Sequence, residues 1–337
     1  LKERDMTAMV TLHHFTSPLW LTEMGGWENE AVVELFAAFS RRVVEALGSH
    51  CDYWVTINEP NVYMSGGYLG GGFPPGKNDI KTALKVLRNM LKAHAAAYQA
   101  IHEAQSGAMV GVAHHWRGFL PANRGPLTRF SANLHNKVFN EAFPQALRTG
   151  KFDAVMLKED IPQAKDTQDF IGLNYYTREL VRFDLSKPSE VFTQRFYPKD
   201  AELSETDFLN NDPEGFKACI KWGAQFGKPI YITENGVDDS KDDFRRKYLL
   251  QHLHAMWHAV NHNVPVKGYF HWSLVDNFEW ERGWTQRFGL WGIDPATQAR
   301  TRRMSVDLYA DICRTNSITS ECVEKYCPEV YERIYPV

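Results

Sequence analysis

The sequence predicts an α/β protein of the (β/α)8 TIM-barrel class, with about six of the eight βα units present in the chain. Six short apolar runs alternate with amphipathic helical segments, which is the pattern of parallel strands joined by helices. Each run ends in polar or aromatic side chains. Chemistry at the carboxyl ends of many strands is typical of a barrel, whereas a doubly wound open sheet would gather it mainly at one switch point.

We expect the six strands, in chain order, over residues 8–15, 53–57, 110–115, 169–174, 229–233 and 267–272. Between the first two runs, Val32, Phe36 and Phe39 recur at helical spacing, with Asn29 as the expected N-cap and Gly48 just past the end. A Gly/Pro-rich loop follows the second run. Further helices are expected over 79–104, 131–148, 216–222 and 244–260.

We interpret residues 1–337 as a single barrel catalytic domain, because no low-complexity tract or linker divides the chain. Residues 177–212 form a long polar and aromatic insertion, which we expect to be a loop over the site. The chain opens at Leu1 without an initiator Met or a signal-peptide pattern and runs quickly into a strand. We therefore expect further sequence upstream, so that an N-terminal part of the barrel is missing here.

Charge and cysteine content restrict the possible partners. The chain has 38 Lys+Arg against 41 Asp+Glu, a net charge of −3, which argues against nucleic acid as a partner. No run approaches the ~18 apolar residues that a membrane span requires, so no membrane partner is expected. Five scattered cysteines favour reduced thiols in a soluble, cytoplasmic protein. The sequence leaves the oligomeric state open.

Two glutamates follow predicted strands. Glu59 lies in Thr-Ile-Asn-Glu-Pro, and Glu234 lies in Ile-Thr-Glu-Asn-Gly. A carboxylate at the end of an apolar strand must be paired or face a polar cavity, because an unpaired buried charge is costly. Two of them on one barrel face suit glycoside hydrolysis, in which one carboxyl protonates the leaving oxygen and the other attacks the sugar or activates water. A surface glutamate that caps a loop is the alternative for each one alone.

Aromatic residues cluster after the sixth run, in His-Trp-Ser-Leu-Val-Asp-Asn-Phe-Glu-Trp-Glu-Arg-Gly-Trp. Sugars have apolar C–H faces and polar edges, so this cluster beside Glu279 suits a pyranose. Packing in the core is the alternative for each aromatic residue. We expect Trp272 and Trp280 to serve function and Phe278 to pack in the core. At the third run, the residues His114-His115-Trp116 either line the leaving-group side of the cleft or pack in the core.

Four motifs in this order make the chain recognisable: Asn58-Glu59-Pro60, Asp169-Phe-Ile-Gly-Leu-Asn-Tyr-Tyr176, Thr233-Glu234-Asn235-Gly236 and Asn277-Phe-Glu-Trp280. Together they resemble glycoside hydrolase family 1, the β-glucosidase/β-galactosidase type. The resemblance implies a retaining β-glycosidase on a (β/α)8 barrel that needs no cofactor. Two strands precede the first run in that family, and with them a glutamine that binds the glycone and an arginine that pairs with the nucleophile.

The resemblance also implies roles for individual residues. Glu59 matches the acid/base and Glu234 the nucleophile, while Asn58 matches the residue that binds the sugar 2-hydroxyl. Tyr176 matches the tyrosine that donates to the nucleophile, and Asn174 its polar neighbour. In the site for the non-reducing sugar, or glycone, four further residues match: His14, Trp272 as a stacking platform, and Glu279 and Trp280, which read the far hydroxyls. Glu279 would repel a phosphate, so the expected substrate is a small, non-phosphorylated β-glycoside or oligosaccharide.

The retaining mechanism requires an ionised nucleophile and a protonated acid, so we expect the pKa values of the two glutamates to be pushed apart, with Glu59 holding the proton. The alternative function is a non-catalytic, family-like protein that binds sugar or has an interaction role, inactive because the first strands are missing. A metal enzyme is not indicated. His254 and His258 stand four residues apart, but Ala255 follows His254 where H-E-x-x-H requires glutamate.

Overall fold

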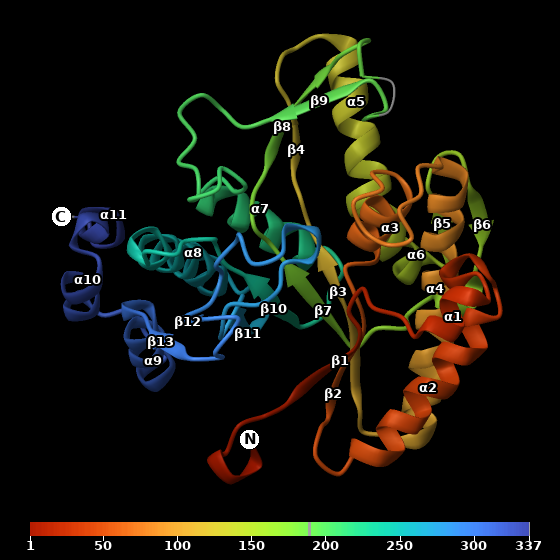
Figure 1. Cartoon of the computed structure of the whole chain (residues 1–337), viewed down its shortest axis with the longest axis horizontal. Helices are drawn as coiled ribbons and strands as arrows, with labels where there is room; N and C mark the ends of the chain where they lie inside the picture. Colours follow the sequence, from red (N-terminus) through yellow and green to blue (C-terminus); the bar gives the residue numbers. More distant parts are fainter. Residues whose placement is uncertain (188–189, 337) are drawn as a thin grey trace.

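The computed structural model describes residues 1–187 and 190–336. Its centre is a sheet of six parallel strands in the spatial order β1-β2-β3-β7-β10-β11, the same as their order along the chain. This sequential order is that of a barrel wall, and it confirms the six predicted strands and the predicted fold class (Figure 1). The strands are β1 Met9–His13, β2 Tyr53–Asn58, β3 Met109–His115, β7 Phe170–Asn174, β10 Ile230–Asn235 and β11 Val266–His271.

Helices lie between consecutive strands and cover the sheet (Figure 1). The helices are α1 Leu19–Glu23, α2 Val32–Leu47, α3 Pro60–Tyr68, α4 Ile80–Ala104, α5 Pro126–His135, α6 Ala142–Thr149, α7 Pro213–Ala224, α8 Asp243–Asn261, α9 Met304–Thr315, α10 Ser320–Tyr326 and α11 Tyr331–Ile334. One apolar cluster joins α2, α3 and α4 to β2 and β3. A second cluster joins α7 and α8 to β7 and β10. These two clusters hold the strand ends in fixed positions.

The predicted helix over 79–104 is confirmed. It begins where Asp79 accepts a hydrogen bond from the backbone N–H of Thr82 at 2.8 Å, which satisfies one of the free donors of the first turn. The expected start of α2 differs from the structure, because Ala31 is its N-cap. Gly48 stands just past the end of the helix, as expected, in a right-handed conformation. Asn29 still accepts a hydrogen bond from the backbone of Ala31.

Helix α3 was not predicted, because its sequence contains two glycines and begins with a proline. Pro60 stands at the first helical position, where a missing N–H costs nothing. Gly66 is needed for close packing, since a Cβ there would meet the ring of Phe73 at 2.7 Å. The helix over 131–148 was predicted as one element, but α5 and α6 are joined by a π-helical segment, Asn136–Glu141.

The segment 177–212 contains two strands, β8 Glu179–Phe183 and β9 Thr193–Phe196, which form a three-stranded sheet with β4 Phe119–Pro121. Its later part reaches the loop after β10, where the Thr206 hydroxyl donates to Asp238 at 2.7 Å. That it covers a bound substrate stays a prediction. Two short antiparallel pairs complete the strands: β5 Lys151–Asp153 with β6 Lys158–Asp160, and β12 Trp291–Ile293 with β13 Arg300–Arg302. None of the described helices is long and apolar enough to cross a membrane.

Four deeply buried histidines predict that the fold is sensitive to acid. Burial lowers the pKa of His13, His114 and His252 to about 3 and that of His94 to about 4. The unfolded chain takes up protons below about pH 6.5, but the folded chain does not. Stability is therefore lost as the pH falls from 6.5 toward 4, by about 1.4 kcal/mol per pH unit for each histidine.

Chemical unfolding at pH 7.5 and at pH 5 tests this expectation. The exposed His262 offers a control. His252→Gln should flatten the dependence of the unfolding free energy on pH, whereas His262→Gln should leave it as in the wild type. An unfolding free energy that stays constant between the two pH values would contradict the prediction.

Candidate active site

The predicted site residues come together at the carboxyl ends of the parallel strands. Because the strands are parallel, their carboxyl ends meet at one edge of the sheet. Hydrogen bonds or ring contacts connect all nine predicted residues into two groups: Glu59, Glu234, Asn58, Asn174 and Tyr176 around the carboxylates, with His14, Trp272, Glu279 and Trp280 beside them.

Glu59 directly follows β2 and is 6% exposed. Its Oε1 lies 2.8 Å from Nδ1 of His115 and accepts a hydrogen bond from Nδ2 of Asn174, also at 2.8 Å. The backbone of Glu59 has φ of 45°, the left-handed region that non-glycine residues rarely adopt. Such a conformation persists only where the surroundings impose it, and it is common at functional sites.

Glu234 belongs to β10 and is 8% exposed. The hydroxyl of Tyr176 donates to its Oε2 at 2.7 Å, as the sequence predicts. Glu234 stands opposite Asn174 in the register of β10 and β7, and the Oδ1 of Asn174 accepts from Thr233 at 2.6 Å. Asn174 therefore lies between the two glutamates and orients both.

The pKa values of the two glutamates are pushed apart, but in the opposite order to the one expected. Burial and the negative charge of Glu59 raise the pKa of Glu234 well above its usual range, despite the Tyr176 hydrogen bond. Burial also acts to raise the pKa of Glu59, but His115 and Asn174 outweigh it and lower that pKa. The reason is the distribution of partners: the imidazole of His115 faces Glu59, and within residues 1–187 and 190–336 no lysine or arginine forms an ion pair with Glu234.

A cavity of about 270 Å³ reaches Glu234, and its volume is close to the lower end of the ~300–1,000 Å³ range of small-molecule pockets. Glu234, Asn58 and His14 line it together with Trp272. Nε2 of His14 lies 3.1 Å from Nδ2 of Asn58. The cavity is therefore lined by polar groups of Glu234, Asn58 and His14 and by the aromatic ring of Trp272.

The aromatic cluster after β11 holds Glu279. The indole N–H of Trp272 donates to its Oε1 at 3.1 Å, and Nδ2 of Asn277 donates to the same oxygen at 2.7 Å. The rings of Trp272 and Trp280 lie 5.7 and 5.6 Å from that of His14. The expectation that Phe278 packs in the core is wrong, because its side chain is 56% exposed.

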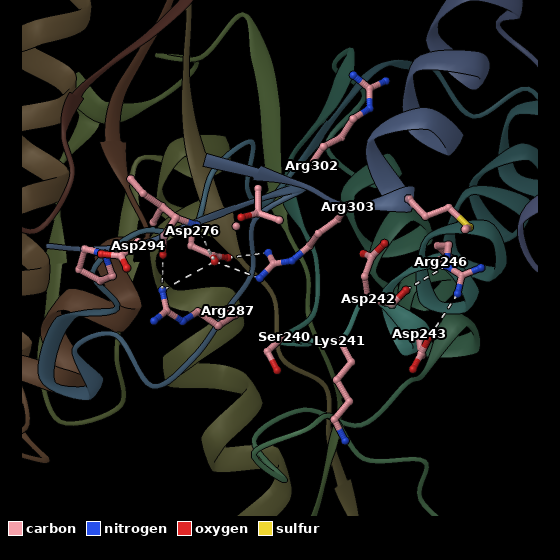
Figure 2. Close-up of a pocket in the computed structure, with 15 residues that line it drawn as sticks. Ser240, Lys241, Asp242, Asp243, Arg246, Asp276, Arg287, Asp294, Arg302 and Arg303 are labelled. Atoms are coloured by element: carbon pink, nitrogen blue, oxygen red, sulfur yellow. Dashed lines mark hydrogen bonds and ion pairs between the residues drawn. The ribbon is translucent and has the colours of Figure 1, made fainter. Parts of the chain in front are cut away.

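A larger cavity, of about 690 Å³, lies elsewhere, near the start of α8 and the β12–β13 pair (Figure 2). None of the nine predicted residues lines it. Its charged groups mostly bind one another: Arg303 holds both oxygens of Asp276, at 2.8 and 3.0 Å, and Asp242 accepts from the backbone N–H of Ser305. We therefore assign the chemistry to the smaller cavity, which Glu234 lines together with Asn58, the residue before Glu59.

His115 is one of the three residues, with His114 and Trp116, whose role the sequence left open. The structure places it against Glu59, with its ring stacked on Tyr176 at 5.9 Å between centroids. Its position at the end of β3 was a signal, since the other site residues also follow strand ends. The sequence could not show that its imidazole faces a glutamate 56 residues away.

His115→Phe is expected to move the alkaline limb of the pH profile of kcat/KM to higher pH, by about 1 unit if Glu59 is the acid. The phenyl ring keeps the stacking on Tyr176 but removes the group that lowers the pKa of Glu59. A raised pKa keeps Glu59 protonated to higher pH. His102, which lies 2.9 Å from Asp169 far from the cavity, provides a control pair: His102→Phe should leave the limb in place. A downward shift or no shift in His115→Phe would contradict the assignment.

Comparison with known proteins finds similar sequences over nearly the whole chain. The sequence profile described as "Glycosyl hydrolase family 1" matches residues 1–318. Beta-glucosidase A of Thermotoga maritima is 33% identical over 94% of this chain and 76% of its own length. A beta-galactosidase of Pyrococcus woesei is 32% identical over 96% of this chain and 72% of its own.

Solved structures of similar proteins have the same fold over nearly the whole chain. A beta-glycosidase from Pyrococcus horikoshii superposes with a TM-score of 0.89 and 35% identity, over 96% of this chain and 75% of that one. A beta-glucosidase from Thermotoga maritima in complex with deoxynojirimycin superposes with a TM-score of 0.88 and 30% identity, over 94% and 76% of the two chains.

Proposed function

This chain belongs to glycosyl hydrolase family 1, and on that basis we propose that it is a retaining β-glycosidase that releases the terminal sugar from small β-D-glucosides, galactosides or fucosides. One observation carries the proposal: two buried glutamates at the ends of β2 and β10 flank the same asparagine, Asn174. A retaining glycosidase requires such a pair, about 5–5.5 Å apart, on either side of the scissile bond.

In the first step, a carboxylate oxygen of Glu234 attacks the anomeric carbon and forms a covalent bond to it. The bond from that carbon to the leaving oxygen breaks, and the leaving oxygen takes a proton from Glu59. Tyr176, which donates to Oε2 of Glu234, holds the carboxylate in one orientation. Asn174 fixes Glu59 relative to it.

In the second step, Glu59 accepts a proton from water as the water oxygen attacks the anomeric carbon. The bond to Glu234 breaks, and the sugar leaves with its original anomeric configuration. Any acceptor hydroxyl can replace water, so transfer to another sugar competes with hydrolysis. No step requires a metal or a cofactor.

The first step needs the single proton of the pair on Glu59, whereas the pKa directions of the free site favour Glu234. Bound substrate is expected to reverse this preference. The anomeric carbon becomes positively charged in the transition state, directly beside Glu234, and that charge stabilises the ionised form. The proton then passes to Glu59, next to the leaving oxygen.

The glycone is expected to lie on Trp272, with its far hydroxyls at Glu279. One oxygen of Glu279 already accepts two hydrogen bonds, from Trp272 and Asn277, so the group is held rigidly. A carboxylate fixed in this way accepts hydrogen bonds from sugar hydroxyls but repels a phosphate. This supports a non-phosphorylated sugar, as does the binding of deoxynojirimycin, a sugar-like inhibitor, by the Thermotoga relative.

A 2-deoxy-2-fluoro-β-glucosyl fluoride tests the proposal, because the fluorine slows both steps and the good leaving group lets the covalent intermediate accumulate. Peptide mapping is expected to find the sugar bound to Glu234. Labelling of Glu59 would reverse the two roles. A protein that stays unlabelled, yet binds glucose in calorimetry, would support the non-catalytic sugar-binding alternative.

A further inference from the structure

Helix α5 carries its large apolar side chains on the outside. Leu127 is 55% exposed and Phe130 is 64% exposed, while the small residues Thr128, Ser131 and Ala132 are buried. The buried residues face β4 and β8, where the hydroxyl of Thr128 accepts a hydrogen bond from the backbone of Phe183. A surface helix normally shows the reverse distribution, with its large apolar residues turned inward.

The exposed side of α5 is itself divided into two stripes. At 100° per residue, Leu127, Phe130 and Leu134 fall on one stripe. Arg129 and Asn133 fall on a second stripe beside it. The helix therefore has an inner face of small residues, an outer apolar stripe, and a polar stripe with a positive charge.

The segment around α5 is positively charged throughout. Residues 104–140 contain no aspartate or glutamate, although the whole chain has 41 of them. Two exposed basic side chains, Arg124 and Arg129, lie just before and along the helix, and a third, Lys137, pairs with Asp153 at 3.0 Å. An exposed apolar stripe flanked by basic residues is the pattern of a helix that lies on an anionic membrane surface.

The position of α5 connects this surface to the active site. The chain passes from His115, at the end of β3, through β4 into α5. The helix thus stands beyond the carboxyl ends of the strands, beside β8 and β9, and away from the N-terminus (Figure 1). A surface that binds here lies on the same side of the sheet as the two glutamates.

From these observations we infer that α5 docks the protein onto an anionic lipid surface, with Leu127 and Phe130 inserted among the headgroups and Arg124 and Arg129 at the lipid phosphates. A second copy of the chain fits this surface less well, because a symmetric contact would bring two positive, acid-free segments together. The absence of a membrane-spanning run does not bear on docking of this kind, because the helix lies on the membrane and does not cross it.

The wild-type chain is expected to co-sediment with vesicles of phosphatidylglycerol and phosphatidylcholine at low salt, and much less with vesicles of phosphatidylcholine alone. The double variant Arg124→Gln/Arg129→Gln should weaken binding about fivefold for each arginine removed. The double variant Leu127→Ser/Phe130→Ser should weaken binding at least as much and should also remove the part that persists at high salt.

Met156, which is 63% exposed in the turn between β5 and β6, provides the control. Met156→Ser should bind vesicles as the wild type does, and every variant should hydrolyse a soluble aryl glycoside at the wild-type rate, which shows that the site has folded. Three results would overturn the inference: no binding of the wild type to anionic vesicles, equal binding by all variants, or a wild-type dimer in gel filtration that only the α5 variants dissociate. Vesicle binding is measured without turnover, so a failure here is distinct from a failure of the proposed hydrolysis.

Discussion

Glu234→Ala is expected to lower kcat/KM for a β-glucoside by roughly 10⁴-fold or more, because removal of a nucleophile eliminates the covalent route altogether. The substrate site should remain, since Tyr176 and Asn174 are held by other contacts as well. Steady-state kinetics with an aryl β-glucoside measure the loss. Calorimetry with a competitive sugar-like inhibitor measures the binding that stays.

Azide makes the assignment of Glu234 specific. In the alanine variant, azide can enter the space of the lost carboxylate and attack the anomeric carbon as the aryloxide leaves. This single displacement inverts the configuration, so the product is the α-glycosyl azide. Glu281 is exposed and lies two residues after Glu279, so Glu281→Gln serves as the control and should retain activity. Full activity of Glu234→Ala, or a β-glycosyl azide as its product, would contradict the nucleophile role.

Glu59→Gln is expected to act according to the leaving group. With an unactivated alkyl or sugar leaving group, kcat/KM should fall by about 10²–10⁴-fold, because the leaving oxygen no longer receives a proton. With a dinitrophenyl glycoside, which needs no acid, formation of the covalent intermediate should stay fast. Loss of the general base then slows its hydrolysis, so a burst of dinitrophenolate should precede a slow steady state.

Stopped-flow absorbance resolves the burst, and its amplitude should approach one per enzyme molecule. Azide needs no general base, so in Glu59→Ala it should restore turnover and give the β-glycosyl azide, the opposite anomer from the Glu234 variant. Equal losses for good and poor leaving groups, without a burst, would assign Glu59 a structural role instead.

The pH dependence of the pair connects both variants with His115. In the free site, His115 lowers the pKa of Glu59, while burial and Glu59 raise that of Glu234. Two close carboxyls titrate as a unit, so removal of either one should change the pH profile of the other. Glu59→Gln removes a negative charge beside Glu234 and should lower the pKa of Glu234, because one of the three causes of its rise disappears while burial and the charge of Glu279 remain.

Several elements could be predicted from the sequence because local pattern determines them. Six apolar runs bounded by turn residues gave six parallel strands, and Asp79 marked the start of α4 through its own hydrogen bond to Thr82. Helix α3 could not be predicted, because Gly66 and Gly67 argue against a helix. The ring of Phe73, which packs where a Cβ at Gly66 would lie, supplies the tertiary reason for glycine.

The identities of the site residues were also accessible from the sequence. Parallel strands align their carboxyl ends, so a glutamate after β2 and a glutamate at the end of β10 must approach one another in a barrel wall, whatever lies between them in the chain. The four motifs identified the residues around the two glutamates as further candidates. Exposure was harder: Phe278 looks like a core residue in sequence, and only packing shows that it faces solvent.

The sequence by itself thus determined which side chains are candidates for the chemistry, since strand periodicity and strand direction depend on the backbone and on local hydrophobic pattern. Only the tertiary structure decided the neighbours of each side chain, and with them its pKa and its exposure. His115 faces Glu59 across 56 residues, Asn174 bridges two strands, and the large residues of α5 turn outward. Charge and solvation act through space over a few ångströms, so the pKa of a carboxyl and the partner of a helix face depend on neighbours that chain order does not specify.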